Sequence, residues 1–199
     1  MREIELNNKK YQIIGQRYET GKNSLCYHIY LDNDFFLKIT ENKETILNLP
    51  HFPKVVEEGI INDQYYVIYQ YVDGKLLKEV DNISRDLVIS LFEAILDIKK
   101  MGYLIFDVNP TNFIINEVVN ILDYPSLVSI NKKDLQLNDY VKNVMNKEFF
   151  DEEVMLYFVA VMLDECKGEK DAFINLLIQD IVKRKFATVE EVISYLKAK

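Results

Sequence analysis

The chain has 199 residues, of which 49% are hydrophobic, so it is long enough and apolar enough to fold around a buried core. A formal net charge of −8 argues against a general nucleic-acid-binding protein, because phosphate contacts need clustered Lys and Arg. No apolar run approaches the roughly 18 residues of a membrane span, and the polar start of the chain does not resemble a signal peptide. The widely separated Cys26 and Cys166 favour reduced core residues of a cytoplasmic protein, with a single disulfide as the alternative.

The first third of the chain has the apolar and alternating runs typical of β-strands, separated by turn-forming residues, and an antiparallel meander follows naturally. Lys38 ends one of these otherwise apolar strands, where a buried ammonium group needs a partner; an exposed strand end is the alternative. A short helix is predicted over 41–49, before Pro50. The strands are predicted at 11–14, 25–31, 35–39, 55–61 and 64–71, with a turn at Asn62 and Asp63 between the last two.

Helical spacing dominates the rest of the chain. Ser84 is a plausible N-cap for a long helix that Gly102 ends, and Thr188 with Glu191 forms a capping box that opens the last helix. Two more apolar helices are predicted, one over 154–166 and one beginning at Phe173. The segment 126–150 has mixed polarity and weak periodicity, which predicts only partial order.

Three oxygen-bearing side chains surround a predicted hairpin in the middle of the chain. An apolar run ends at Asp107, a loop containing Pro110 reaches Asn112, and Asp123 directly follows the second hairpin strand. Such a layout can hold a hard cation, because Mg²⁺ prefers oxygen ligands and usually takes one or two from carboxylates. The alternative is that Asp107 and Asn112 are simply turn residues flanking Pro110. The two strands are predicted at 113–115 and 118–122.

This stretch resembles the catalytic core of the protein-kinase-like superfamily. The family's catalytic loop reads His-Arg-Asp-x-x-x-x-Asn and is followed by a strand pair and Asp-Phe-Gly. Here Asp107 and Asn112 have the same spacing, and Asp123 precedes Tyr124 and Pro125. The resemblance implies an α+β, bilobal protein-kinase-like fold in one domain, with a small antiparallel β N-lobe (1–72) and a mainly α-helical, truncated C-lobe (73–199).

The resemblance also implies phosphoryl transfer from ATP with Mg²⁺. Asp107 would be the catalytic base, and Lys38 would grip the α- and β-phosphates. Asn112, on the catalytic loop, would hold Mg²⁺ together with Asp123. We expect these four side chains to converge on one nucleotide between the lobes. Further implied nucleotide contacts are Gly21 and Ser24 in place of the glycine-rich loop, the backbone of Gln70 and Val72, and Glu44, with Glu41 as the alternative, as the partner of Lys38.

Several positions depart from the family pattern. Phe36 replaces the small residue that roofs the adenine, Gly21 alone remains of the three loop glycines, and Pro125 replaces a glycine. Phe106 replaces the arginine that reads a phosphorylated activation loop, which predicts no control of that kind. The leading hypothesis is a Ser/Thr protein kinase acting on a protein substrate. The alternatives are a pseudokinase that binds a regulatory partner as a scaffold, and a small-molecule kinase of the aminoglycoside or choline type. Against the last, Asn109 replaces a histidine common in those loops.

Overall fold

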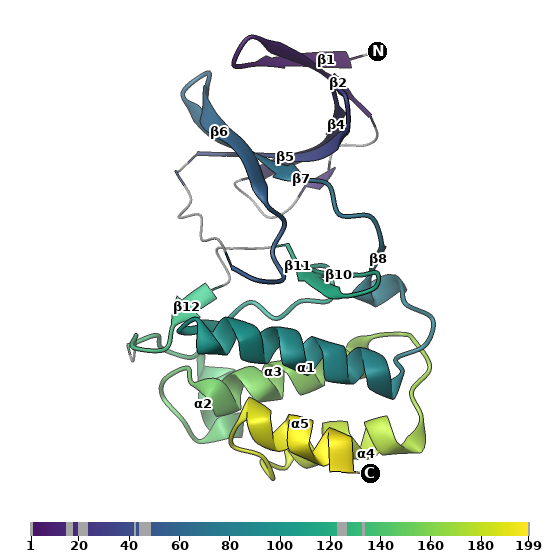
Figure 1. Ribbon diagram of the computed structural model, residues 1–199. Coiled ribbons are helices and arrows are strands. Elements are labelled where there is room, and N and C mark those ends of the chain that lie inside the picture. Colours follow the sequence, from purple (N-terminus) through teal and green to yellow (C-terminus); the bar gives the residue numbers. More distant parts are fainter. Residues whose placement is uncertain are drawn as a thin grey trace. The chain divides into compact units, whose positions relative to one another are not determined.

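The computed structural model of the protein describes residues 2–14, 18–19, 24–41, 43, 49–122, 127–132 and 134–198. The chain divides into two compact units, one formed by Met1–Asn48 with Phe52–Asp73 and the other by Leu49–His51 with Gly74–Lys199. The first unit is an antiparallel sheet and the second is mainly helical (Figure 1). The predicted α+β class is therefore confirmed, whereas the single domain with lobes at 1–72 and 73–199 stays a prediction.

The first unit is a curled antiparallel sheet in which the strands follow the order β1-β2-β4-β5-β7-β6, with the short β3 paired to β4 (Figure 1). All five predicted strands form, but β1 and β3 were not predicted. The sequence before Asn7 alternates charged and apolar residues, and Asn7 and Asn8 adopt φ of 48° and 62°, which suits a tight hairpin turn. The strands are β1 (Arg2–Leu6), β2 (Lys9–Ile13), β3 (Tyr18–Glu19), β4 (Ser24–Tyr30), β5 (Asp34–Thr40), β6 (Val55–Ile61) and β7 (Gln64–Gln70).

A second turn of the same kind joins β6 to β7. Asn62 and Asp63 have φ of 47° and 62°, a conformation that Asn and Asp tolerate better than most residues, so the predicted turn is confirmed. The predicted helix over 41–49 falls mostly on residues that lie outside the described ones.

One face of the curled sheet forms the core of the first unit. Side chains alternate between the two faces of a strand, so residues two apart share a face. The buried members of this core are Leu6, Tyr11, Ile29, Leu37, Ile39, Tyr66 and Ile68.

Glu57 links the two ends of the curled sheet. It lies on β6, yet its carboxylate accepts hydrogen bonds from Lys9 Nζ on β2 at 2.8 Å and from the Tyr66 hydroxyl at 2.9 Å. Burial of Glu57 raises the pKa of its carboxyl, but these hydrogen bonds and the charge of Lys9 outweigh burial, so the pKa is lowered overall. Burial, and then the neighbouring carboxylate, raise the pKa of Tyr66 to about 12. Gly59 leaves room for this arrangement, because a Cβ there would lie 2.7 Å from the Tyr66 ring.

Within its described residues, the second unit has five helices and two small sheets, one formed by β8, β10 and β11 and one by β9 and β12 (Figure 1). α1 packs against α5, and α3 packs against α4. Only residues 166–171 separate α3 from α4, so no further helix lies between these two. The helical part is therefore short, as the sequence predicted. The helices are α1 (Arg85–Lys100), α2 (Asp139–Met145), α3 (Glu152–Glu165), α4 (Ala172–Val182) and α5 (Val189–Ala198). The strands are β8 (Lys75–Leu76), β9 (Tyr103–Ile105), β10 (Phe113–Ile115), β11 (Val119–Ile121) and β12 (Leu127–Ser129), and a 3₁₀ turn spans Leu77–Glu79.

Side-chain caps fix the helix starts. Ser84 Oγ accepts the amide of Leu87 at 3.2 Å, and Thr188 Oγ1 accepts the amide of Glu191 at 3.3 Å, as the sequence predicted. The second half of the predicted capping box is displaced by one residue, because the Glu191 carboxylate accepts the amide of Ala187 at 2.7 Å. Gly102 has a φ of 90°, which a glycine tolerates after a helix end. None of the helices in the described part of the chain combines the length and apolar composition needed to cross a bilayer.

The segment 126–150 is more regular than the sequence predicted. It contains β12, which pairs with β9, and α2. Asn138 caps α2 by accepting the amide of Val141 at 2.9 Å, while Val141 and Met145 bury one face of the helix. The helix spans only seven residues, which are too few to give a strong periodic signal, and this explains why the helix was missed.

Lys99 joins three helices of the second unit. Its ammonium on α1 contacts Glu152 Oε1 on α3 at 2.8 Å and Glu190 Oε2 on α5 at 2.6 Å. Glu152 Oε1 also accepts the amide of Val189 at 2.7 Å, so the same carboxylate holds the start of α5. Burial lowers the pKa of Lys99, but the two carboxylates outweigh it and raise the pKa overall, while Lys99 lowers the pKa of Glu190.

We predict that Glu57→Gln lowers the free energy of unfolding of the first unit by about 1–2 kcal/mol at pH 7, because charge-assisted hydrogen bonds are lost. Since the folded-state pKa of Glu57 is lowered, its stabilisation is present above the unfolded pKa and is lost as the pH falls through the folded one. The gap between wild type and variant should therefore narrow under acid conditions in urea titrations. Glu5→Gln, on an exposed side chain of β1, is the control. A gap that stays constant with pH would contradict the assignment.

We predict that Lys99→Met lowers the free energy of unfolding by about 2 kcal/mol at pH 7, because two carboxylates lose their partner. Lys100→Met is the matched control, since its pair with Asp97 is exposed and should contribute less than about 1 kcal/mol. The raised pKa of Lys99 means that its contribution is present below the unfolded pKa and is lost as the pH rises through the folded one. Urea denaturation followed by helical circular dichroism measures both variants, and equal losses would disprove the difference.

Candidate active site

The loop from Asp107 to Asn112 connects β9 to β10. Its start is firmly held, because Leu104 and Ile105 of β9 are buried, whereas Asp107 is exposed two residues later. β10 then pairs with β11 on one side and with β8 on the other. The predicted hairpin is thus confirmed, and it extends into a three-stranded sheet that the sequence did not indicate. The exposed carboxylate therefore stands on a loop whose two ends are fixed by strands.

Asn112 is held through both its backbone and its side chain. Its amide N–H donates to Asn109 O at 2.9 Å, and its carbonyl accepts from the amide of Leu122 at 2.8 Å. Its side-chain Nδ2 donates to Asp107 O at 3.3 Å. Because one end of the carboxamide is committed to the backbone of Asp107, the orientation of the other end is set. Oδ1 accepts no hydrogen bond among the described residues, which leaves it available as an oxygen ligand.

A buried hydrogen bond ties the start of this loop to α3. The amide of Ile105 donates to Met155 Sδ at 3.4 Å, in a site where both residues are almost completely buried. A backbone N–H buried without an acceptor costs about 1–3 kcal/mol, so even a weak thioether acceptor matters here. Sequence reasoning missed this contact, because Met155 reads only as one more apolar position of a buried helix.

Aromatic packing holds the next residue. The Phe106 ring lies edge-on to Phe150 with ring centroids 5.1 Å apart, and to Phe158 with centroids 6.5 Å apart. Such edge-to-face pairs add about 0.5–1.5 kcal/mol to the burial of the rings. The position that carries an arginine in the resembled family therefore makes an apolar contact in this protein.

His51 fixes the strand that leads toward Asp123. Its carbonyl accepts the amide of Ile121 at 2.6 Å, its Nδ1 lies 3.0 Å from Val119 O, and its Nε2 lies 3.2 Å from Asp97 Oδ2. Each ring nitrogen of His51 therefore lies within hydrogen-bond distance of an oxygen acceptor. The bonds from Lys100 and His51 lower the pKa of the Asp97 carboxyl. A lone histidine gives no periodic signal, so the sequence did not reveal this role.

Three predicted site residues, Gly21, Glu44 and Asp123, lie outside the described residues. The other predicted site residues of the first unit lie within the described part of the chain; they are Lys38, Ser24, Gln70 and Val72. Lys38 is half-buried on β5 between Cys26 of β4 and Val67 of β7. Ser24 begins β4 opposite Thr40. Gln70 ends β7, where its amide donates to Lys54 O at 2.8 Å, and the partly exposed Val72 follows two residues later.

Lys38 and Phe36 lie on the face of the sheet opposite the first unit's core. Leu37 and Ile39, which alternate with them along β5, belong to that core. Phe36 lies opposite His28 and Tyr69, and its ring centroid is 6.5 Å from that of Tyr69. Lys38 is therefore flanked on the neighbouring strands by Cys26 and Val67, and the bulky ring of Phe36 shares its face of the sheet.

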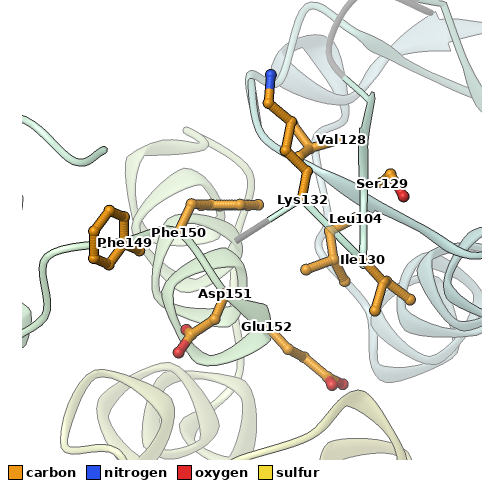
Figure 2. A pocket seen from close by; sticks show the side chains of 9 residues that line it. All are labelled: Leu104, Val128, Ser129, Ile130, Lys132, Phe149, Phe150, Asp151 and Glu152. Atoms are coloured by element: carbon orange, nitrogen blue, oxygen red, sulfur yellow. The ribbon is translucent and has the colours of Figure 1, made fainter. Parts of the chain in front are cut away.

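The second unit has a separate pocket of about 320 Å³ (Figure 2). Its walls are mainly apolar side chains of β9, of β12 with the residue that follows it, and of the segment just before α3. The Phe150 ring points across the pocket toward Val128, whereas the Asp151 carboxylate points away (Figure 2). None of the site residues predicted from the sequence lines this pocket. Its apolar lining consists of Leu104, Val128, Ile130, Phe149 and Phe150.

Mg²⁺ is the metal that the resemblance implies, and the described donors fit it in part. Asn112 Oδ1 is an oriented neutral oxygen, and the Asp107 carboxylate is exposed on the same loop. Hard cations take such oxygen ligands. Among the residues that the structure describes, no three His, Cys, Asp or Glu side chains gather as a metal cluster. Mg²⁺ usually binds one or two carboxylates together with waters and substrate phosphate oxygens, so the amide oxygen of Asn112 supplies one part of such a site.

Comparison with known proteins supports the fold. No family model matches the sequence, and no curated protein matches it. A crystal structure of the PknI kinase domain of Mycobacterium tuberculosis matches this chain with a TM-score of 0.59 and 13% sequence identity. The match covers 94% of this chain and 95% of that domain. The protein therefore has a protein-kinase-like fold.

We predict that Met155→Leu lowers the free energy of unfolding by about 2 kcal/mol, because the buried amide of Ile105 loses its acceptor. Met162→Leu is the matched control: it lies on the same helix, is 2% exposed, and its sulfur accepts no hydrogen bond from the described residues. A Met-to-Leu exchange of packing alone costs less than about 1.5 kcal/mol. Urea denaturation measures the free energy of unfolding of both variants. If Met155→Leu lowers it no more than Met162→Leu does, the hydrogen bond from the Ile105 amide to Met155 does not contribute to stability.

Proposed function

We propose that the protein transfers the γ-phosphoryl group of ATP, with Mg²⁺, to a hydroxyl acceptor, most simply Ser or Thr of a protein. The observation that carries this proposal is the loop from Asp107 to Asn112 on a protein-kinase-like fold. There an exposed carboxylate and an oriented carboxamide are spaced as in the resembled family. Phosphoryl transfer needs mainly in-line positioning and neutralisation of phosphate charge, which such a loop can supply.

Each proposed residue has a defined chemical task. The Asp107 carboxylate orients the acceptor hydroxyl and takes its proton as the new P–O bond forms and the bond to ADP breaks. The Asn112 Oδ1 atom, together with Asp123, would hold Mg²⁺. When bound, the metal offsets negative charge on the phosphates. Lys38 supplies a fixed positive charge to the α- and β-phosphates.

The remaining assignments concern the nucleotide itself. We assign Gly21 and Ser24 to the phosphates, the backbone of Gln70 and Val72 to the adenine edge, and Glu44 to Lys38. Support comes from the position of Lys38 on the face opposite the core of its sheet, which leaves its stem among apolar side chains and its ammonium at the end of a flexible chain.

A second candidate function is a scaffold that binds a regulatory partner without catalysis. The Phe36 ring favours it, because this ring occupies the same face as Lys38 and lies beside Tyr69. A ring at this position fills space that a purine would need. A nucleotide-binding test therefore separates the two candidates.

We predict that ATP with Mg²⁺ raises the melting temperature, because a ligand that binds only the folded state stabilises it by about 2.7 kcal/mol at a hundred times its Kd. Radiolabelled γ-phosphate should then pass to a protein acceptor. Asp107→Asn and Asp123→Asn should each lower kcat by at least about a hundredfold. Asp139→Asn, on a fully exposed carboxylate of α2, is the control and should retain wild-type transfer.

Two outcomes would contradict the proposal. An unchanged melting temperature at millimolar nucleotide would favour the scaffold, and full activity of both Asp variants would show that the assigned roles are wrong. Transfer to small alcohols or aminoglycosides, but not to a protein acceptor, would instead identify a small-molecule kinase.

A further inference from the structure

Asn109 has its side chain folded back into the loop that carries Asp107 and Asn112. Its Oδ1 accepts two hydrogen bonds from Thr111, one from the backbone amide at 2.9 Å and one from Oγ1 at 2.7 Å. An Asn side chain that accepts the amide two residues later closes a turn without the help of neighbouring elements. Asn109 is exposed, yet its side-chain oxygen is fully committed within the loop.

This turn determines where Asn112 lies. The carbonyl of Asn109 accepts the amide of Asn112 at 2.9 Å, so the same residue holds Thr111 with its side chain and Asn112 with its backbone. Pro110 lies between them with a φ restricted by its ring. Thr111 is thus fixed at two atoms immediately before the residue assigned to Mg²⁺.

The neighbouring hairpin offers a natural comparison. Asn116 Oδ1 accepts the amide of Val118 at 3.0 Å and Asn120 Nδ2 at 3.4 Å, which is the same kind of turn. That turn lies between β10 and β11, and its hydrogen bonds to Val118 and Asn120 do not involve Asn112. Removing it therefore perturbs a similar turn outside the loop from Asp107 to Asn112.

We propose that Asn109 is a positioning residue for phosphoryl transfer, which holds Asn112 at the distance from Asp107 that the reaction requires. This inference rests on the proposed function. A displacement of about 1 Å in a catalytic group can cost up to a hundredfold in rate. A loop of six residues therefore needs internal hydrogen bonds, such as those of Asn109 to Thr111, to keep its catalytic groups in place. The side chain acts through Thr111 and Asn112 and touches no reacting atom itself.

The side chain at position 109 determines whether the hydrogen bonds from Thr111 are kept. An Asp at position 109 retains the acceptor oxygen at the same branch point, whereas an Ala has none. Thr111→Val removes the Oγ1 donor and keeps the backbone donor, so it should have an intermediate effect. These variants form a graded series that a general loss of stability would not reproduce.

The test measures steady-state kinetics of the full chain with ATP, Mg²⁺ and a protein acceptor. Asn109→Ala should lower kcat by about tenfold to a hundredfold, change KM for ATP by less than about threefold, and raise the Mg²⁺ concentration needed for half-maximal rate. Asn109→Asp should recover most of the rate, and Asn116→Ala should match wild type. Melting temperatures of all variants are recorded, so that unfolding is not mistaken for loss of positioning.

Amide hydrogen exchange of the ligand-free protein gives an independent measurement. Asn109→Ala should speed exchange at Thr111 and Asn112 by about tenfold or more, and Asn116→Ala should speed it at Val118 only. Wild-type kcat in Asn109→Ala, or equal loss in Asn109→Ala and Asn109→Asp, would overturn the inference. If the wild-type protein transfers no phosphate, the proposed function fails. The amide exchange rates then test separately whether Asn109 holds Asn112 in place, and unchanged rates in Asn109→Ala would overturn that part of the inference as well.

Discussion

The hydrogen bond from the Ile105 amide to the Met155 sulfur is the contact on which the candidate site depends. It is buried, so breaking it cannot be compensated by water. It joins the strand before Asp107 to α3, a helix that is apolar on most of its circumference and so belongs to the centre of its unit. The same helix begins with Glu152, the carboxylate that Lys99 and the start of α5 share. The position of the loop is thereby coupled to the packing of the whole helical unit.

Local patterns in the sequence were sufficient to predict most of the secondary structure. The helix after Ser84 and the one after Thr188 have both an apolar period and a capping side chain, and they form as predicted. α2 was missed because seven residues with two buried apolar positions give too weak a signal. β1 was missed because three of its five residues are charged, which makes the segment resemble a polar chain end.

Contacts between distant residues could not be predicted in this way. Met155 and Ile105 are 50 residues apart, and His51 reaches Val119 across 68 positions, so no periodicity relates the partners. Asn109 is a different case, because Asn before Pro is a recognised turn signal. The sequence pattern therefore indicates this turn, whereas the resemblance to the kinase family concerns only Asp107 and Asn112 at the two ends of the loop. The face shared by Lys38 and Phe36 follows directly from the two-residue period of a strand.

The ring of Phe106 has one more consequence, for the response of the protein to its solution conditions. Ion pairs on a protein surface weaken as salt rises, because mobile ions screen charges separated by more than about 8–10 Å at ordinary ionic strength. The contacts of Phe106 with Phe150 and Phe158 involve no formal charge. The residue next to Asp107 is therefore held by a force that concentrated electrolyte does not diminish, and kosmotropic salts such as sulfate strengthen it.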